Sequence, residues 1–261
     1  MTQATEVLVP GSADEAVKLF GDGNDVTVIG GGTIVVPELA NGRRSAGKAL
    51  LLTRAGLAGV SRNGSRVTIG AATPVQELVG LEAPVGPCAA NVADVEVRSQ
   101  GTVGGNLCAA VDEVPRGDLQ SALLAVGATV RSAGAGGIAE QALEDFLPER
   151  DGRLILDVSY DEPEAGSFVA LERPHAHVYT ALGVSAARAG DGTIRVAATG
   201  LAAHGVRLPS AEAAADDPGK AGADAVDDVS PTDDALASAW YRSKTLPVLV
   251  RRALTELKEQ A

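Results

Sequence analysis

Two glycine-rich segments constrain this chain more than any other feature of its sequence. The first, residues 29–34, reads IGGGTI and directly follows an apolar run; the second, residues 98–107, reads RSQGTVGGNL. Glycine tolerates positive φ and lets a ligand approach the main chain, so consecutive backbone N–H groups can form a nest for an anion. Two such segments predict a site for a large phosphate-bearing cofactor that is held from both sides.

Either glycine segment alone would also fit an ordinary tight turn. The residues around the glycines nevertheless narrow the choice of cofactor. Neither reads GxGxxG between a strand and a long helix, and the GK[ST] end of a P-loop is missing, so Rossmann and P-loop sites are disfavoured. The net charge of −12 means that main-chain amides, rather than cationic side chains, are the expected ligands of a pyrophosphate. These features favour FAD, with Asp118 as an acceptor for its hydroxyl groups, as a helix N-cap, or as both.

Charge and cysteine content exclude several other classes. A chain this acidic is a poor partner for nucleic acids or anionic membranes. No apolar run approaches the roughly 20 residues of a membrane span, and the N-terminus lacks the features of a signal peptide, so a cytoplasmic protein is expected. Cys88 and Cys108 have no metal-binding spacing and are predicted to be reduced thiols, Cys108 in the core, with a disulfide as the alternative. His175 and His177 lack an evident third ligand and are predicted to be structural, so no metal site is expected.

The alternation of apolar and polar residues predicts an α+β chain. Expected strands cover residues 6–10, 26–29, 50–53, 67–71, around 130, 153–158, 168–171, 178–187 and 194–198. A capping box at Ser12 opens a helix over 13–20, Thr73-Pro74 is expected to open another, and a third covers 119–126. Residues 211–229 fit either a helix pair or a mobile loop, and Ser230-Pro231 is expected to open a helical tail with apolar residues at helical spacing.

The order of these segments resembles the FAD-binding, medium-size subunit of the molybdenum hydroxylases, a family that includes carbon monoxide and xanthine dehydrogenases. The segments that carry the resemblance are residues 12–16, 30–37, 69–73, 98–106, 117–119, 241–242 and 251–254. Residues 98–106 are the most specific match, to the pattern R-x-x-G-T-x-G-G-N, and the C-terminal helix is the least specific.

The resemblance implies a PCMH-like, two-subdomain FAD-binding fold over residues 1–158, with subdomains 1–55 and 56–158. A C-terminal module over 159–261 would contain a three-stranded antiparallel sheet with helices. The cofactor-binding residues that it implies are Gly30, Gly31, Gly32, Thr33, Ile34, Val35, Thr73, Thr102, Val103, Gly104, Gly105, Asn106 and Asp118.

The resemblance also implies a role in a larger complex. The chain would carry electrons through FAD from a small iron–sulfur subunit to a terminal acceptor, beside a large molybdenum-cofactor subunit, in a dimer of heterotrimers. No acid–base constellation is predicted on this chain, because the flavin supplies the chemistry. The iron–sulfur clusters and the molybdenum cofactor are expected on the partner subunits alone, since two cysteines cannot ligate a four-cysteine cluster.

Two departures from the family pattern leave alternatives open. Ile34 stands where the family commonly has Asp or Ser, which removes a side-chain acceptor from the first segment. The chain has extra residues around 111–114 relative to the family pattern. Asp112 or Glu113 is therefore an alternative to Asp118 as the acidic residue that contacts the cofactor. A stand-alone FAD-dependent oxidoreductase, or a scaffold subunit that has lost FAD, are therefore the competing hypotheses.

Overall fold

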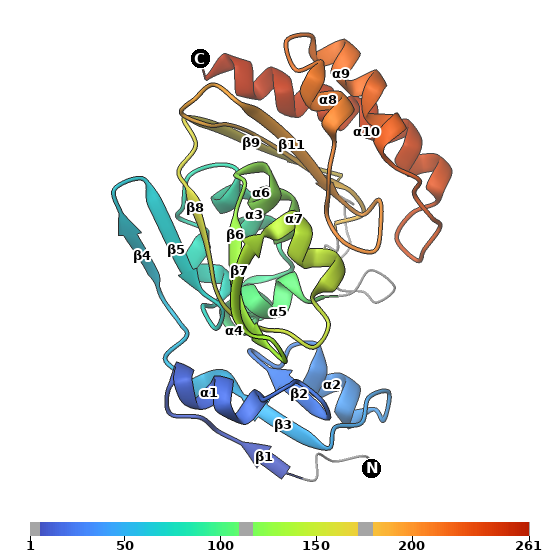
Figure 1. Ribbon diagram of the computed structural model, residues 1–261. Coiled ribbons are helices and arrows are strands. Elements are labelled where there is room, and N and C mark those ends of the chain that lie inside the picture. Colours follow the sequence, from blue (N-terminus) through green and yellow to red (C-terminus); the bar gives the residue numbers. More distant parts are fainter. Residues whose placement is uncertain (1–5, 110–116, 172–179, 261) are drawn as a thin grey trace. The chain divides into compact units, whose positions relative to one another are not determined.

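The computed structural model describes residues 6–109, 117–171 and 180–260, and it contains two compact units (Figure 1). Unit 1 comprises Met1–Glu77, Val95–Cys108 and Thr129–Ser159; unit 2 comprises Leu78–Asp94, Ala109–Ala128 and Tyr160–Ala261. Both units are assembled from separated stretches of the chain. The predicted division into domains at residue 158, and into subdomains at residue 55, stays a prediction.

A small parallel sheet begins unit 1. Its strands are β1 (Glu6–Leu8), β3 (Lys48–Leu51) and β2 (Val26–Ile29), in the order β1-β3-β2. Helix α1 (Ala13–Phe20) connects β1 to β2, and its buried residues Ala16 and Phe20 share an apolar cluster with Leu50 of β3. The sequence predicted a strand at residues 50–53. The strand, β3, instead ends at Leu51, because Leu52–Arg54 forms a 3-10 helix.

The predicted Ser12 cap of α1 is confirmed, but Glu15 returns its bond to the amide of Gly11, before the cap, rather than to that of Ser12. Ser12 Oγ accepts a hydrogen bond from the N–H of Glu15 at 3.1 Å, and Glu15 Oε2 accepts one from the N–H of Gly11 at 2.7 Å. A Ser12→Ala substitution leaves the Glu15 amide uncapped, so we expect it to lower the free energy of unfolding by about 1 kcal/mol. Urea denaturation measures this loss. Ser61→Ala, on an exposed strand, is the control and is expected to change stability by less than about 0.5 kcal/mol.

The second sheet of unit 1 has five strands. Their order is β4 (Val60–Asn63), β5 (Arg66–Gly70), β8 (Leu154–Asp161), β6 (Thr129–Gly134) and β7 (Gly137–Ala142). Burial alternates along β5, with Val67 and Ile69 fully buried, as the strand period of two predicts. Short helices complete the unit: α2 (Val35–Ala40), α4 (Val95–Gln100), α5 (Val103–Leu107) and α7 (Leu143–Phe146), with 3-10 turns at Val75–Leu78 and Leu147–Glu149.

Unit 2 is built around a four-stranded antiparallel sheet. Its order is β12 (Val206–Arg207), β11 (Ile194–Thr199), β10 (Gly183–Arg188) and β9 (Ala165–Ala170). The three predicted strands are present. The sequence did not predict β12, because two residues are too few to show an alternation of apolar and polar side chains. Helices α3 (Val85–Asn91), α6 (Leu119–Ala125), α8 (Pro209–Ala213), α9 (Pro218–Asp224) and α10 (Ala239–Glu259) pack within this unit, with a 3-10 turn at Ala225–Asp228.

Helices cover both faces of β10, whose first five residues are all buried. Helix α10 packs on β9 and β10, whereas α6 packs on β10 and β11 (Figure 1). The apolar residues predicted along the tail are buried as expected: Leu246, Leu249, Val250, Ala253, Leu254 and Leu257. The segment 211–229 forms helices, which decides between the two predicted alternatives. None of the helices in the described ranges has the length and apolarity that a bilayer crossing requires.

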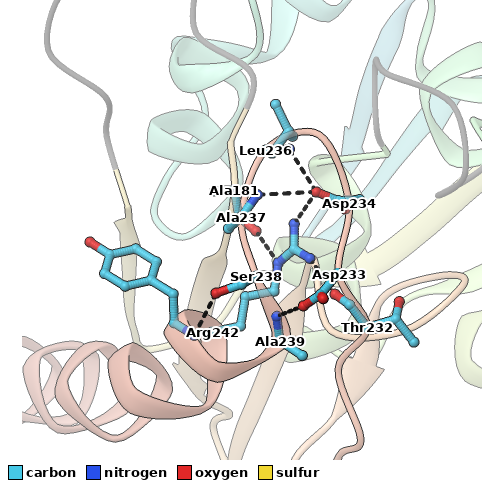
Figure 2. A network of polar contacts seen from close by, with 10 residues as sticks. Ala181, Thr232, Asp233, Asp234, Leu236, Ala237, Ser238, Ala239 and Arg242 are labelled. Atoms are coloured by element: carbon cyan, nitrogen blue, oxygen red, sulfur yellow. Dashed lines mark hydrogen bonds and ion pairs between the residues drawn. The ribbon is translucent and has the colours of Figure 1, made fainter.

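The start of α10 differs from the prediction. The helix begins at Ala239 rather than near Ser230-Pro231, because polar side chains satisfy the preceding backbone in an irregular turn (Figure 2). Asp234 Oδ1 accepts hydrogen bonds from the N–H groups of Leu236 and Ala237 at 2.8 and 3.2 Å. Such local carboxylate–amide bonds compete with helical ones and favour a turn.

Arg242, in the first part of α10, stabilises this turn through hydrogen bonds. It is 1% exposed, and its Nη2 donates to Asp234 Oδ1 at 2.7 Å. Nη1 donates to the carbonyl of Thr232 at 2.7 Å, and Nε donates to that of Ala181 at 3.3 Å (Figure 2). Burial lowers the pKa of Arg242, and the nearby charge of Asp233 opposes that shift. The guanidinium thus joins the turn, the helix and the chain that enters β10.

Candidate functional site

The first glycine segment links β2 to α2 in unit 1. Gly32 adopts φ +75°, which only glycine accepts readily, and Ile34 stands at the N-cap position with no side-chain capping bond. Within the described ranges, no hydrogen bond is recorded for the N–H groups of Gly31, Gly32, Thr33 and Ile34. These four residues are neither fully buried nor fully exposed. The segment therefore presents consecutive amide donors at the start of a helix, where an anion is stabilised.

The second segment is mostly helical, rather than the open turn or nest that its glycines suggested. Helix α4 ends at Gln100 and α5 begins at Val103, so only Gly101 and Thr102 connect them. Thr102 is the N-cap of α5, and its Oγ1 accepts a hydrogen bond from the N–H of Gly105 at 3.2 Å. In this chain, therefore, Thr102 and the Gly104-Gly105 pair that follows it mark the start of a helix.

The amides of α5 are directed into the protein. The N–H of Val103 donates to the carbonyl of Thr73 at 3.0 Å, and that of Gly104 donates to the carbonyl of Ala71 at 2.8 Å. The predicted anion nest at Gly104 and Gly105 is therefore absent from this conformation, because its donors are already used. Contact of residues 102–106 with a cofactor stays a prediction, and it would not use the amides of Val103, Gly104 and Gly105, which already donate within the chain.

Thr73 supports the loop after β5 instead of capping a helix. Its hydroxyl accepts from the N–H of Gly59 at 2.9 Å and donates to the carbonyl of Gly59 at 3.1 Å, and the residue is fully buried. The predicted capping role is wrong, since a tertiary partner uses the hydroxyl that a cap requires. Pro74 pairs with Thr102 in an isolated bridge, and the N–H of Val75 donates to the carbonyl of Gly101 at 2.8 Å.

Three segments of unit 1 therefore meet: residues 30–34, 69–75 and 98–107. The approach of the first to the third is too close for any side chain. A Cβ on Gly31 would lie 1.7 Å from the carbonyl oxygen of Gln100, and one on Gly30 would lie 2.3 Å from Thr102 Oγ1. Gly104 is less restricted, since its Cβ would lie 3.1 Å from that of Ala71. Local sequence gave no signal for the Gly31–Gln100 contact, which depends on the tertiary fold.

This arrangement fits the diphosphate of a dinucleotide. Gly30 and Gly31 let the second segment close against the first. At Gly32 the chain turns, and the amides of residues 31–34 have no partner among the described residues. The Thr33 hydroxyl belongs to the first segment and lies near Gly101 of the second, since a Cβ built on Gly101 would be 3.5 Å from Thr33 Oγ1. Partial charges on amides can hold an anion in a chain of net charge −12, as the sequence predicts.

Asp118 lies in unit 2, at the N-cap position of α6. It is 5% exposed, has helical φ and ψ, and makes no side-chain capping bond, so the predicted capping role is wrong. Its carbonyl oxygen accepts from Cys88 Sγ and from Ser121 Oγ, both at 3.3 Å. Burial, and then the charge of Asp118, raise the pKa of the Cys88 thiol, which therefore stays protonated. Sequence reasoning missed Ser121 as a partner of Asp118.

The remaining predicted groups contribute little to a site. Cys88 and Cys108 are free thiols, as predicted, but Cys108 is exposed rather than in the core. His204 Nδ1 lies 2.8 Å from the carbonyl oxygen of its neighbour, Gly205. Asp112, Glu113, His175 and His177 lie outside the described residues. Among the residues that are described, three metal-ligating side chains nowhere come together.

Comparison with known proteins gives a consistent result. The family model described as "FAD binding domain in molybdopterin dehydrogenase" matches residues 3–159. The chain is 27% identical to the carbon monoxide dehydrogenase medium chain of Afipia carboxidovorans, covering 97% of this chain and 99% of that one. It is 26% identical to the alpha subunit of the 6-hydroxypseudooxynicotine dehydrogenase complex of Paenarthrobacter nicotinovorans, covering 98% and 95%.

A solved structure shares the fold. A chain of the carbon monoxide dehydrogenase from Hydrogenophaga pseudoflava, in a form that lacks the Mo-pyranopterin moiety of the molybdenum cofactor, superimposes with a TM-score of 0.87. The two chains are 22% identical, and the match covers 100% of this chain and 99% of the other. This likeness confirms the predicted α+β, PCMH-like fold.

Proposed function

We propose a function from the premise that this chain belongs to the family of FAD-binding domains in molybdopterin dehydrogenases. The chain is the FAD-carrying medium subunit of a molybdenum hydroxylase complex, and it passes electrons from an iron–sulfur subunit through the flavin to a terminal acceptor. The molybdenum cofactor resides on a large partner subunit and the clusters on a small one. We further propose a cytoplasmic complex that is a dimer of such heterotrimers.

The observation that carries this proposal is the run of amide donors at residues 31–34. Four consecutive N–H groups without a recorded partner in the described part of the chain, at a helix start, suit the negative diphosphate that FAD carries. These residues are half-buried, so the amides remain accessible to a ligand, and an anion that accepts from them gains charge-assisted hydrogen bonds. FAD, when bound, supplies the electron acceptance and transfer.

The residues of this chain bind and orient the cofactor. Gly31, Gly32, Thr33 and Ile34 would hold the diphosphate through their amides, with the Thr33 hydroxyl as a further donor. Thr73 acts indirectly, since it fixes the loop that receives the amides of α5. The other residues proposed to contact FAD are Gly30, Val35, Thr102, Val103, Gly104, Gly105, Asn106 and Asp118.

A conservative substitution tests the first segment. Thr33→Val keeps the shape of the side chain and removes its hydroxyl, so we expect the dissociation constant of FAD to rise about five- to tenfold, the effect of about 1 kcal/mol. Fluorescence titration of the flavin-depleted complex measures this constant. Thr53→Val, at an exposed position of the same unit, is the control and should leave the constant unchanged.

The purified complex distinguishes the proposal from its alternatives. Flavin absorption bands at near-stoichiometric occupancy, together with co-purifying iron–sulfur and molybdenum subunits, are the expected result. A colourless complex would support the scaffold hypothesis. Full flavin occupancy in a chain that associates with no other subunit would support a stand-alone oxidoreductase.

A further inference from the structure

The turn that follows β5 in unit 1 holds α4 and the residue after it. The N–H of Val75 donates to the carbonyl of Gly101 at 2.8 Å, which is a contact between main chains. The next residue of the turn adds a side-chain contact, in which Gln76 Oε1 accepts from Arg98 Nε at 3.0 Å. Two neighbouring residues of the turn therefore fix two points at the end of α4, one through the backbone and one through a side chain.

Helix α4 has little apolar packing to fix its position. It is six residues long, and none of its residues is fully buried. Helices shorter than about 12 residues are marginal in water on their own, so contacts with the rest of the unit must hold α4 in place. Apolar burial contributes little to this, since Val95 is 49% exposed and Val97 is only half-buried. Polar contacts such as that of Arg98 with Gln76 therefore have a large share in placing the helix.

The end of α4 limits the space at the first glycine segment. A Cβ on Gly31 would lie 1.7 Å from the carbonyl oxygen of Gln100, the last residue of α4, so the main chain of Gly31 lies against that carbonyl. A displacement of α4 therefore changes a contact at the start of the amide run of residues 31–34. Several N–H groups can bind one anion only when they point to the same place, because a hydrogen bond weakens steeply as its angle departs from linear. The position of α4 is thus linked to the geometry of those amides.

We propose that Gln76 and Arg98 are positioning residues, whose hydrogen bond holds α4 against Gly31 and so keeps the amides of residues 31–34 directed at the FAD diphosphate. This inference rests on the proposed function, and it requires neither side chain to touch the cofactor. A site that is ordered before binding loses less entropy when the ligand arrives, so the bond raises the affinity for FAD. A purely structural role would instead change stability and leave the affinity of the folded complex unchanged.

A double-mutant cycle tests the inference in the intact, flavin-depleted complex. Gln76→Met keeps the length of the side chain and removes the acceptor, so it is expected to raise the dissociation constant of FAD about three- to tenfold. Arg98→Met should cause at least as large a loss, because Arg98 has other interactions in addition. In the Arg98→Met background, Gln76→Met should cause no further loss, since the bond that it would break is already gone. Fluorescence titration of the flavin measures each constant.

Ser132→Ala is the matched control. Ser132 is a fully buried residue of the same unit, and its hydroxyl accepts from Arg153 Nε at 3.1 Å, so this variant also removes a neutral side-chain acceptor from an arginine. In the flavin-depleted complex we expect Ser132→Ala to lower the melting temperature at least as much as Gln76→Met does, with FAD affinity unchanged. An affinity that falls in step with the melting temperature in both variants would overturn the inference, because it would show a general loss of order.

The outcomes separate this inference from the proposed function. If the wild-type complex does not bind FAD, the proposed function fails and the inference with it. If FAD binds and Gln76→Met leaves its dissociation constant unchanged, only the inference fails. Losses that add fully in the double variant would likewise overturn it, since they would show that Gln76 acts independently of Arg98.

Discussion

A Gly31→Val complex will be purified without bound flavin, or with less than about a tenth of the wild-type occupancy. The reason is steric: a Cβ at residue 31 would lie 1.7 Å from the carbonyl oxygen of Gln100, and the obstructing atom belongs to backbone that cannot rotate away. The glycine segment and the end of α4 must then separate, which moves the amide donors of residues 31–34. A tenfold loss of affinity corresponds to about 1.4 kcal/mol, and we expect at least that.

The ratio of absorbance at flavin wavelengths to that at 280 nm measures the occupancy. Gly136→Ala is the matched control, because it lies in the same unit and a Cβ there would meet open space. Gly105→Val should have a weaker effect than Gly31→Val, since the nearest atom to its Cβ is the Thr102 Oγ1, 3.1 Å away. Full flavin occupancy in Gly31→Val would exclude residues 31–34 as the diphosphate site.

Short-range patterns were sufficient for much of the fold. The Ser12 cap of α1, strand β2 and the buried face of α10 all follow from residues within a few positions of one another, so the sequence predicts them with their boundaries or close to them. The turn between β10 and β11 has the same local origin, since Asp191 Oδ1 accepts from the N–H of Thr193 at 2.9 Å. Local hydrogen bonds decide these features, and local sequence encodes them.

Predictions failed where a distant group used the same atoms. Thr73 has the pattern of an N-cap, but Gly59, fourteen residues away, takes both bonds of its hydroxyl. The amides of Gly104 and Gly105 were predicted to bind an anion, and instead they donate to the carbonyl of Ala71 and to Thr102 Oγ1. The glycine segments were predicted as places where a ligand approaches the main chain, and the structure shows that glycine there also permits close contact between the two segments.

The two glycine segments therefore have different roles in the proposed site. In the proposed site the first glycine segment would provide the amide donors, and the second closes against it at Gly30 and Gly31. Sequence alone could not assign these separate roles, because GGG and GG both permit close approach of an anion or of another chain. Only the tertiary contact with Gln100 distinguishes them.

The second large effect is expected at the turn that precedes α10. Asp234→Ala will lower the free energy of unfolding of unit 2 by about 2–4 kcal/mol, because it leaves the guanidinium of Arg242, 1% exposed, without its ion-pair partner. The substitution also removes the acceptor for the N–H groups of Leu236 and Ala237. The value lies below that for a fully buried pair, since the side chain of Asp234 is 22% exposed and Asp233 stays close to the guanidinium.

Arg242→Met provides the informative contrast. It replaces the buried cation with an apolar side chain of similar length. The carboxylate that loses its partner, Asp234, is 22% exposed and still accepts from the turn amides, so the cost should be smaller than that of Asp234→Ala. Urea denaturation monitored by circular dichroism gives the global loss, and hydrogen exchange in the first turn of α10 gives the local one. Asp224→Ala is the control, because it disrupts the exposed pair of Asp224 with Lys220 and should have little effect. Equal losses for Asp224→Ala and Asp234→Ala would mean that burial of Arg242 adds nothing to the stability of this turn.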